Sequence, residues 1–307
     1  MIESLRAGVI GAGVFGGYHA GQYARLPGVV LSAVLDLHPD RAARLALPLG
    51  GRAFHEIDAF LEAVDVVTVA SPATVHAEHA LAALAAGKPV YVEKPIAVGV
   101  AEAETVRAAA EAKGLVVACG HQERVTFRAM GLLDVPEQPI LLEALRHGPP
   151  SERSQDVSAV LDLMIHDLDL ALTLSAAEPV TAEGEGRIGP SGAWDEARAE
   201  VTFEAGFTAR FDVSRMAEAR RRAMRVVFPS GEVELDFLGR TLRNTTPYPL
   251  NRDYAETPAA KDPLGVSVAG FLAAVRGEAP RPVVTASEAI RALDLALAVE
   301  QALEEVG

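Results

Sequence analysis

Hydrophobic runs alternate with stretches of helical periodicity along the first 120 residues of the chain. Continuous apolar runs such as residues 66–70 are typical of parallel strands that are buried on both faces. We predict six strands, at residues 7–10, 31–36, 52–54, 66–70, 90–93 and 115–119. Five helices are predicted between them, at residues 14–26, 39–46, 57–63, 76–86 and 101–113. This order predicts an α/β domain with a doubly wound parallel sheet over residues 1–120.

A different pattern begins after Gly120. Apolar and polar residues alternate in segments that are separated by turn signals such as Ser230-Gly231. These segments predict strands at residues 196–203, 207–214, 224–228, 232–237 and 241–244. Helices are predicted at residues 158–174, 262–276 and 287–305, and a loop at residues 247–263. We therefore expect residues 121–307 to form a second domain with a mainly antiparallel sheet.

A glycine-rich turn joins the first predicted strand to the first predicted helix. Gly11 permits the tight turn, Gly13 leaves room for a pyrophosphate beside the backbone, and Gly16 lets the helix pack close to the strand. The helix starts at Val14 and Phe15, where free N–H groups are expected to face the pyrophosphate. The turn therefore predicts a dinucleotide site, and hydride transfer is the chemistry that such a site favours.

Asp36 ends the second predicted strand, where a carboxylate can accept hydrogen bonds from the adenosine ribose diol. Neither Leu37 nor His38 supplies a guanidinium for a 2'-phosphate, so NAD is favoured over NADP. Arg41 keeps NADP open as the alternative cofactor. In the structural alternative, the glycines only make a turn and Asp36 only caps a loop.

Composition narrows the possible partners. The net charge of −14 argues against nucleic acid and anionic membranes as partners, because their phosphates would repel an acidic protein. The single cysteine, Cys119, cannot form an internal disulfide. The chain lacks the start of a signal peptide and any apolar run near the ~20 residues that span a bilayer, so we expect a cytoplasmic protein.

Residues that directly follow the strands are candidates for ligand contacts, since ligands of doubly wound sheets bind beyond the carboxyl ends of the strands. Lys94 is such a residue, and Pro95 restricts its backbone. Its amine could reach a substrate hydroxyl. The alternative is a surface lysine in a turn.

A polar cluster interrupts the apolar helix that is predicted at residues 158–174. Asp162, His166 and Asp169 fall at i, i+4 and i+7 and would share one helix face. A histidine beside a carboxylate has a tunable pKa near neutrality, as a base that removes a proton from an alcohol requires. A surface salt link is an alternative, and with one histidine and no matching second group we expect no metal site.

Together these motifs resemble the family of glucose-fructose oxidoreductase, inositol dehydrogenase and related sugar dehydrogenases (Gfo/Idh/MocA). The resemblance covers nearly the whole chain. It implies a Rossmann domain followed by an α/β domain whose open, largely antiparallel sheet often serves in substrate binding and oligomer contacts, and hence a homodimer or homotetramer. Members oxidise a ring secondary alcohol of a sugar to a ketone with NAD or NADP. The residues that carry the resemblance, and that it places at the cofactor beside the glycine-rich turn, are Ser71, Pro72, His76, Glu93 and Lys94.

Residues 120–124 and 153–167 resemble one branch of this family, which oxidises the 3-hydroxyl of UDP-N-acetylglucosamine. This finer resemblance implies a nucleotide-sugar substrate, with Arg124, Arg153 and Asp156 as its contacts. A diphosphate needs guanidinium groups in an otherwise acidic protein. Arg220-Arg221-Arg222 is a further candidate by charge density alone, for which surface or intersubunit salt links are the alternative.

The expected mechanism assigns a role to three side chains. Neutral His166 removes the hydroxyl proton, Lys94 stabilises the charge that develops on the same oxygen, and Asp162 orients the pair. A dehydrogenase of a free sugar or of a cyclitol such as inositol would share these residues without a diphosphate site. A dinucleotide-binding sensor or scaffold without turnover is the alternative from another class of protein.

Overall fold

The computed structural model describes residues 4–151 and 156–306, and the chain divides into two compact units. One unit comprises Met1–Gln122 and Asp262–Ile290, and the other comprises Glu123–Lys261 and Arg291–Gly307. The sequence predicts a single boundary after residue 120, whereas residues 262–290 pack with the first compact unit.

The first unit gains its second segment because α9 (Pro263–Val275) is apolar on the side that it buries. Val268, Phe271 and Leu272 of this helix join the same core as Tyr23 and Tyr91. A hydrogen bond of 2.9 Å between the Tyr91 and Ser267 hydroxyls satisfies the polar end of the buried tyrosine. Burial of these side chains therefore attaches α9 to the first unit, although the helix is far from residues 1–122 in the sequence.

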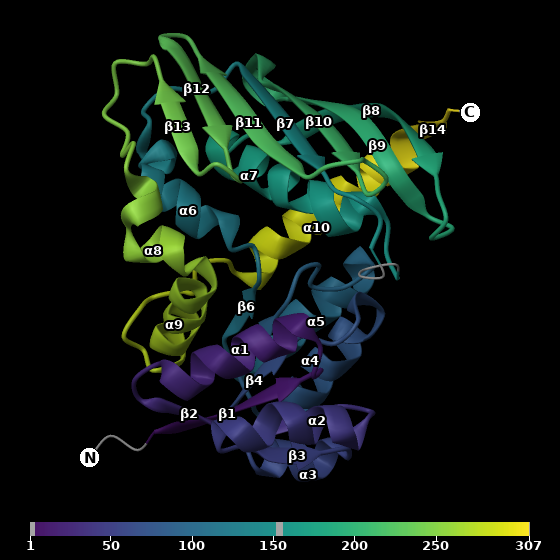
Figure 1. Cartoon of the computed structure of the whole chain (residues 1–307), viewed down its shortest axis with the longest axis vertical. Helices are drawn as coiled ribbons and strands as arrows, with labels where there is room; N and C mark the ends of the chain where they lie inside the picture. Colours follow the sequence, from purple (N-terminus) through teal and green to yellow (C-terminus); the bar gives the residue numbers. More distant parts are fainter. Residues whose placement is uncertain (1–3, 152–155, 307) are drawn as a thin grey trace. The chain divides into compact units, whose positions relative to one another are not determined.

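The sheet of the first unit contains six parallel strands in the order β3-β2-β1-β4-β5-β6, with helices on both of its faces (Figure 1). Its strands are β1 (Leu5–Ile10), β2 (Val29–Leu35), β3 (Arg52–Phe54), β4 (Val66–Val69), β5 (Val90–Val92) and β6 (Val117–Cys119). Its first five helices are α1 (Val14–Arg25), α2 (Pro39–Ala46), α3 (Ile57–Glu62), α4 (His76–Ala85) and α5 (Val100–Lys113). Every predicted strand and helix of this region is present, which confirms the doubly wound fold.

The sheet of the second unit contains eight strands in the order β13-β12-β11-β7-β10-β9-β8-β14. Only the β7–β10 and β8–β14 pairs are parallel, so the mainly antiparallel arrangement is confirmed. The strands are β7 (Leu141–His147), β8 (Pro179–Ile188), β9 (Trp194–Phe203), β10 (Thr208–Ser214), β11 (Arg221–Phe228), β12 (Gly231–Asp236), β13 (Thr241–Asn244) and β14 (Leu303–Glu305). Figure 1 shows α6 (Glu123–Met130) and α7 (Ile165–Ser175) on one face of this sheet.

The sequence does not predict β7, although this strand pairs with both β10 and β11. Its buried positions are Leu142, Ala144 and Arg146, so a charged residue interrupts the apolar alternation. The strand β8 also lacks a signal, because it is largely exposed and contains glycines. These two strands were missed because burial of apolar side chains is the pattern that identifies strands in a sequence.

The last predicted helix is shorter in the structure, where α10 (Ala286–Ala302) is followed by β14. The strand β14 pairs with residues 184–186 of β8. A Cβ atom at Gly184 would lie 2.8 Å from Cδ2 of Leu303, so glycine permits this close approach. The expected loop at residues 247–263 contains the short helix α8 (Pro258–Lys261). No helix in the described part of the chain is long and apolar enough to cross a membrane.

Candidate active site

The glycine-rich turn of the first unit has the geometry that a dinucleotide requires. Gly11 has a φ of +99°, and a Cβ atom there would lie 2.5 Å from the carbonyl oxygen of Ala70. A Cβ atom on Gly16 would lie 1.8 Å from the carbonyl oxygen of Gly11. At Gly13, in contrast, a Cβ atom would meet no described atom within 4 Å. Gly11 and Gly16 are therefore needed by the fold itself, whereas Gly13 leaves space for a ligand.

Two backbone N–H groups hold the Asp36 carboxylate beside this turn. Ala12 donates to Oδ2 and His38 donates to Oδ1, each at 2.8 Å. A carboxylate accepts about four hydrogen bonds, so both oxygens keep capacity for the hydroxyls of a ribose. The first backbone N–H groups of α1 lack acceptors within the helix and suit a pyrophosphate.

Large apolar side chains stand exposed where α1 begins. Val14 is 46% exposed, Phe15 44% and Tyr18 57%, although side chains of this kind are usually buried in a domain of this size. The rings of Phe15 and Tyr18 make an edge-to-face contact with their centroids 5.9 Å apart. An exposed apolar surface beside the glycine-rich turn fits the flat rings of a dinucleotide, so the residues present fit NAD.

Lys94 and Glu93 follow β5, as predicted, but their surroundings differ. Lys94 is half-buried and forms a cis peptide bond with Pro95. Glu93 is buried, and its Oε1 accepts hydrogen bonds from His19 at 2.7 Å and from Gln122 at 3.1 Å. Burial raises the pKa of Glu93, but the hydrogen bond and charge of His19 and the charge of Lys94 lower that pKa below its usual value. Glu93 therefore anchors the base of the loop that carries Lys94.

His76 links two of the loops that follow the strands. Its Nδ1 lies 2.7 Å from the carbonyl oxygen of Pro95, and its Nε2 lies 2.8 Å from the carbonyl oxygen of Ser71. The Ser71 hydroxyl lies 2.9 Å from Nδ1 of His79, and Pro72 precedes a short 3-10 turn. The observed contacts of His76 position the loops, and direct cofactor contacts of His76, Ser71 and Pro72 stay predictions.

Asp162 and His166 belong to the second unit and straddle a change of helix type. Residues Val160–Met164 form a π-helix, and α7 continues from Ile165. Both Asp162 and His166 are half-buried, whereas most of their neighbours are fully buried. Short π-helical segments are rare and occur frequently at functional sites. The sequence predicts a regular α-helix here and misses this feature.

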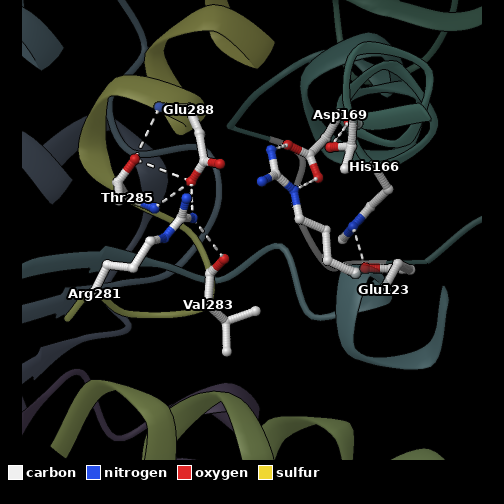
Figure 2. A network of polar contacts seen from close by, with 9 residues as sticks. Glu123, His166, Asp169, Arg281, Val283, Thr285 and Glu288 are labelled. Carbon is white, nitrogen blue, oxygen red and sulfur yellow. Dashed lines mark hydrogen bonds and ion pairs between the residues drawn. The ribbon is translucent and has the colours of Figure 1, made fainter. Parts of the chain in front are cut away.

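The carboxylate of Glu123, on α6, lies against His166 (Figure 2). Its Oε2 is 2.8 Å from Nδ1 of His166, and its Oε1 accepts a hydrogen bond of 3.2 Å from Arg146. Burial raises the pKa of Glu123, but its interactions with His166 and with the charge of Arg146 lower it well below its usual value. A charged carboxylate therefore faces one ring nitrogen of the predicted base.

Arg146 ties this pair to the helix that carries the histidine. It donates to both oxygens of Asp167, at 3.0 Å from Nε and 2.7 Å from Nη2. Burial lowers the pKa of Arg146, but the charges of Asp167 and Glu123 more than reverse the effect and raise that pKa. The bidentate geometry fixes the orientation of the guanidinium.

The three residues that are predicted to contact the substrate differ in their surroundings. Arg124 is buried and donates to both oxygens of Asp169, at 2.8 and 2.6 Å. This pair uses the bidentate edge of the guanidinium that a diphosphate would otherwise engage. Asp156 is exposed in the turn before the π-helix, and Arg153 lies outside the described residues. Substrate contacts of Arg124, Arg153 and Asp156 stay predictions.

Sequence reasoning missed Glu123 as a partner of His166, together with His19 and Arg146. Glu123 directly precedes Arg124 in a segment that the sequence does not predict as helical. The available signal was a charged residue at a position of β7 that alternation assigns to the buried face. Among the residues that the structure describes, no group of three His, Cys, Asp or Glu side chains is placed to hold a metal ion.

A doubly wound sheet with this turn, joined to a second unit with a histidine–carboxylate pair, defines a dinucleotide-binding oxidoreductase. Residues 5–121 match the sequence model of the oxidoreductase family with an NAD-binding Rossmann fold (Gfo/Idh/MocA), and residues 143–234 match the C-terminal domain model of that family. UDP-N-acetylglucosamine 3-dehydrogenase of Acidithiobacillus ferrooxidans is 37% identical over 98% of this chain and 97% of its own. The chain belongs to the Gfo/Idh/MocA family.

Solved structures agree with this assignment. A structure of the Acidithiobacillus ferrooxidans enzyme GnnA matches with a TM-score of 0.89 and 34% identity, covering 98% of both chains. The WlbA dehydrogenase of Bordetella pertussis, solved with NADH and UDP-GlcNAcA, matches in fold at 16% identity, with a TM-score of 0.86 over 98% of this chain and 95% of its own.

A second relative by sequence matches a smaller part of the chain. Inositol 2-dehydrogenase 3 of Saccharopolyspora erythraea is 34% identical over 59% of this chain and 56% of its own.

Proposed function

We propose that this protein oxidises a ring secondary alcohol of a nucleotide sugar, specifically the 3-hydroxyl of UDP-N-acetylglucosamine, with NAD as the oxidant. The observation that carries this proposal is the 37% identity to a UDP-N-acetylglucosamine 3-dehydrogenase across 98% of the chain. That similarity spans both compact units, whereas the inositol dehydrogenase named above matches only 59% of the chain.

The first unit would hold NAD through its glycine-rich turn. Gly13 leaves space for the pyrophosphate, the N-terminus of α1 donates backbone N–H groups to it, and Asp36 accepts from the ribose. Bound NAD supplies a hydride acceptor at C4 of the nicotinamide. The apolar side chains of Val14 and Phe15 would exclude water beside the reacting carbon.

His166 would remove the hydroxyl proton in the second unit. Nδ1 is buried beside the Glu123 carboxylate, so proton transfer falls to Nε2. The imidazolium that results carries its positive charge 2.8 Å from a carboxylate oxygen, so Glu123 stabilises the charge that forms during the reaction. Glu123 thus acts as a positioning residue for the base.

Lys94 would donate a hydrogen bond to the same hydroxyl oxygen during turnover. Its ammonium stabilises the negative charge that develops as the proton leaves. The role of Asp162 in orienting Lys94 and His166 stays part of this proposal.

The experiment that tests the proposed function is a substrate panel with purified protein and NAD. UDP-N-acetylglucosamine should give NADH and a 3-keto product, whereas myo-inositol should give no turnover at equal concentration. Turnover of myo-inositol alone would establish the cyclitol alternative. If the protein binds NAD but neither class of compound gives NADH, the sensor or scaffold would be favoured.

Assembly and location are separate expectations. The face of the second sheet opposite α7 carries a hollow of about 920 Å³ lined by charged side chains that include Glu143, Arg210 and Arg225. We propose a homodimer or homotetramer, as the family resemblance implies, and light scattering in solution would test it. The cytoplasmic location stays a prediction.

A further inference from the structure

Arg222 lies beside the buried charge network of the second unit. It is directly opposite Arg146 in the antiparallel pair of β11 and β7. Met224, Val226 and Phe228 alternate with exposed or half-buried positions along β11, and they are buried. Arg222 has the same parity, so its side chain projects from the buried face of the sheet, as Arg146 does.

The two carboxylates whose charges act on Arg222 already have other partners. Asp167 accepts both of its hydrogen bonds from Arg146, and Glu123 lies between Arg146 and His166. Within residues 4–151 and 156–306, no carboxylate lies within ion-pair distance of Arg222, although its guanidinium is half-buried. Burial and then the charge of Arg146 lower the pKa of Arg222, which shows that its charged form is less well stabilised than in water.

A half-buried guanidinium has five N–H donors and incurs a free-energy cost when they lack acceptors. An anionic group with several oxygens offsets this cost through charge-assisted, bidentate hydrogen bonds. We propose that Arg222 binds a phosphoryl group of the nucleotide-sugar substrate, beside the His166–Glu123 pair. This inference rests on the proposed function for the identity of the anion.

The chemistry of a nucleotide sugar supports this placement. Its diphosphate is attached at C1, two ring carbons from the C3 hydroxyl, so a cation for the diphosphate belongs near the base that deprotonates that hydroxyl. Arg222 is directly opposite Arg146, which donates hydrogen bonds to both Glu123 and Asp167, so this guanidinium lies in the same neighbourhood. The net charge of −14 makes a local cation necessary for any anionic substrate.

Arg221 provides a matched control. It is the preceding residue of the same strand, it is exposed, and strand alternation directs it to the other face of the sheet. Arg222→Met and Arg221→Met remove the same charge and keep a side chain of similar length. Only the first change should affect binding of an anion beside the base.

The test measures binding of UDP and UDP-N-acetylglucosamine to the full chain loaded with NAD, by calorimetry. Arg222→Met should weaken both ligands by about 10- to 100-fold, because hydrogen bonds to a charged group are lost, and Arg221→Met should change neither by more than about twofold. Arg222→Lys should recover part of the affinity, since it restores the charge without the planar fork. Added salt should weaken the wild type more than Arg222→Met.

Several outcomes would overturn the inference. Equal effects of the Arg221 and Arg222 changes would show a general charge effect, and a changed oligomeric state in Arg222→Met alone would assign Arg222 to a subunit contact. Failure of the wild type to bind UDP would also refute it. If the wild type oxidises UDP-N-acetylglucosamine and Arg222→Met does so with an unchanged KM, the inference fails while the proposed function stands. If UDP binding depends on Arg222 but no nucleotide sugar is oxidised, the proposed function fails and the anion site stands.

Discussion

Replacing Glu123 by Gln removes the negative charge beside His166 and retains the size of the side chain. The carboxylate oxygen is 2.8 Å from Nδ1, and the pair is largely removed from solvent. Hydrogen bonds to a charged group contribute about 1.5–3 kcal/mol, and unit charges 4 Å apart attract by at most about 4 kcal/mol near a protein surface. Because the imidazolium forms only during the reaction, this loss should fall on kcat.

The expected result for Glu123→Gln is a decrease in kcat of about 10- to 150-fold with little change in KM. Steady-state NADH formation measures both parameters, and binding of NAD to the first unit should be unchanged. Glu123→Asp should recover part of the lost rate because it restores the charge. The same rate in Glu123→Gln and wild type would refute the role of Glu123.

A double-mutant comparison separates this role from a general effect on folding. In a His166→Ala background the Glu123→Gln change should cause no further loss of residual activity, since the group that it serves is absent. A second, additive loss would show that Glu123 acts elsewhere, for example through its hydrogen bond with Arg146. Asp162→Asn, measured in the same assay, tests the carboxylate that the sequence predicts as the orienting group.

Three further predictions concern the cofactor site, the role of Lys94 and stability in acid. Gly13→Ala should leave the melting temperature unchanged but weaken NAD binding at least tenfold, because its Cβ atom would enter the open space that a pyrophosphate needs; Gly21→Ala, also without a described atom within 4 Å, should bind NAD normally. Lys94→Met should abolish turnover with NAD affinity retained by fluorescence titration, and residual turnover near the wild-type rate would contradict its role. Glu93 and Glu123 have lowered pKa values in the folded protein, so their stabilising contributions should be complete above about pH 5 and be lost as the pH falls through those values. Urea unfolding from pH 7 to pH 3.5 should show this decrease, and a flat profile would refute it.

The first unit could be predicted closely because its central strands are buried on both faces. Such strands are continuous apolar runs, and residues 66–69 are an example in which the pattern and the structure agree. The glycine-rich turn was equally informative, since Gly11 and Gly16 meet steric demands that no other residue satisfies. Local pattern and tertiary environment therefore coincide in this region.

The second unit was harder to predict because charged residues occupy buried positions. Arg146 stands on the buried face of β7 and is stabilised by Asp167, which comes from a distant part of the chain. The partner of His166 is also distant in sequence, since Glu123 belongs to another helix. Pairings of this kind depend on tertiary contacts, whereas the i, i+4 relation of Asp162 and His166 is visible within one segment.

The hydrogen bond from Ala12 to Asp36 connects the residue that is predicted to select the coenzyme to the backbone of the glycine-rich turn. The carboxylate that is predicted to accept hydrogen bonds from an unphosphorylated ribose also accepts one from the backbone of the glycine-rich turn. A switch of coenzyme preference by replacing Asp36 with an apolar residue would therefore leave that N–H without its acceptor and loosen the loop. A successful redesign for the phosphorylated coenzyme must keep a short acceptor at position 36 and add its cation from a neighbouring position.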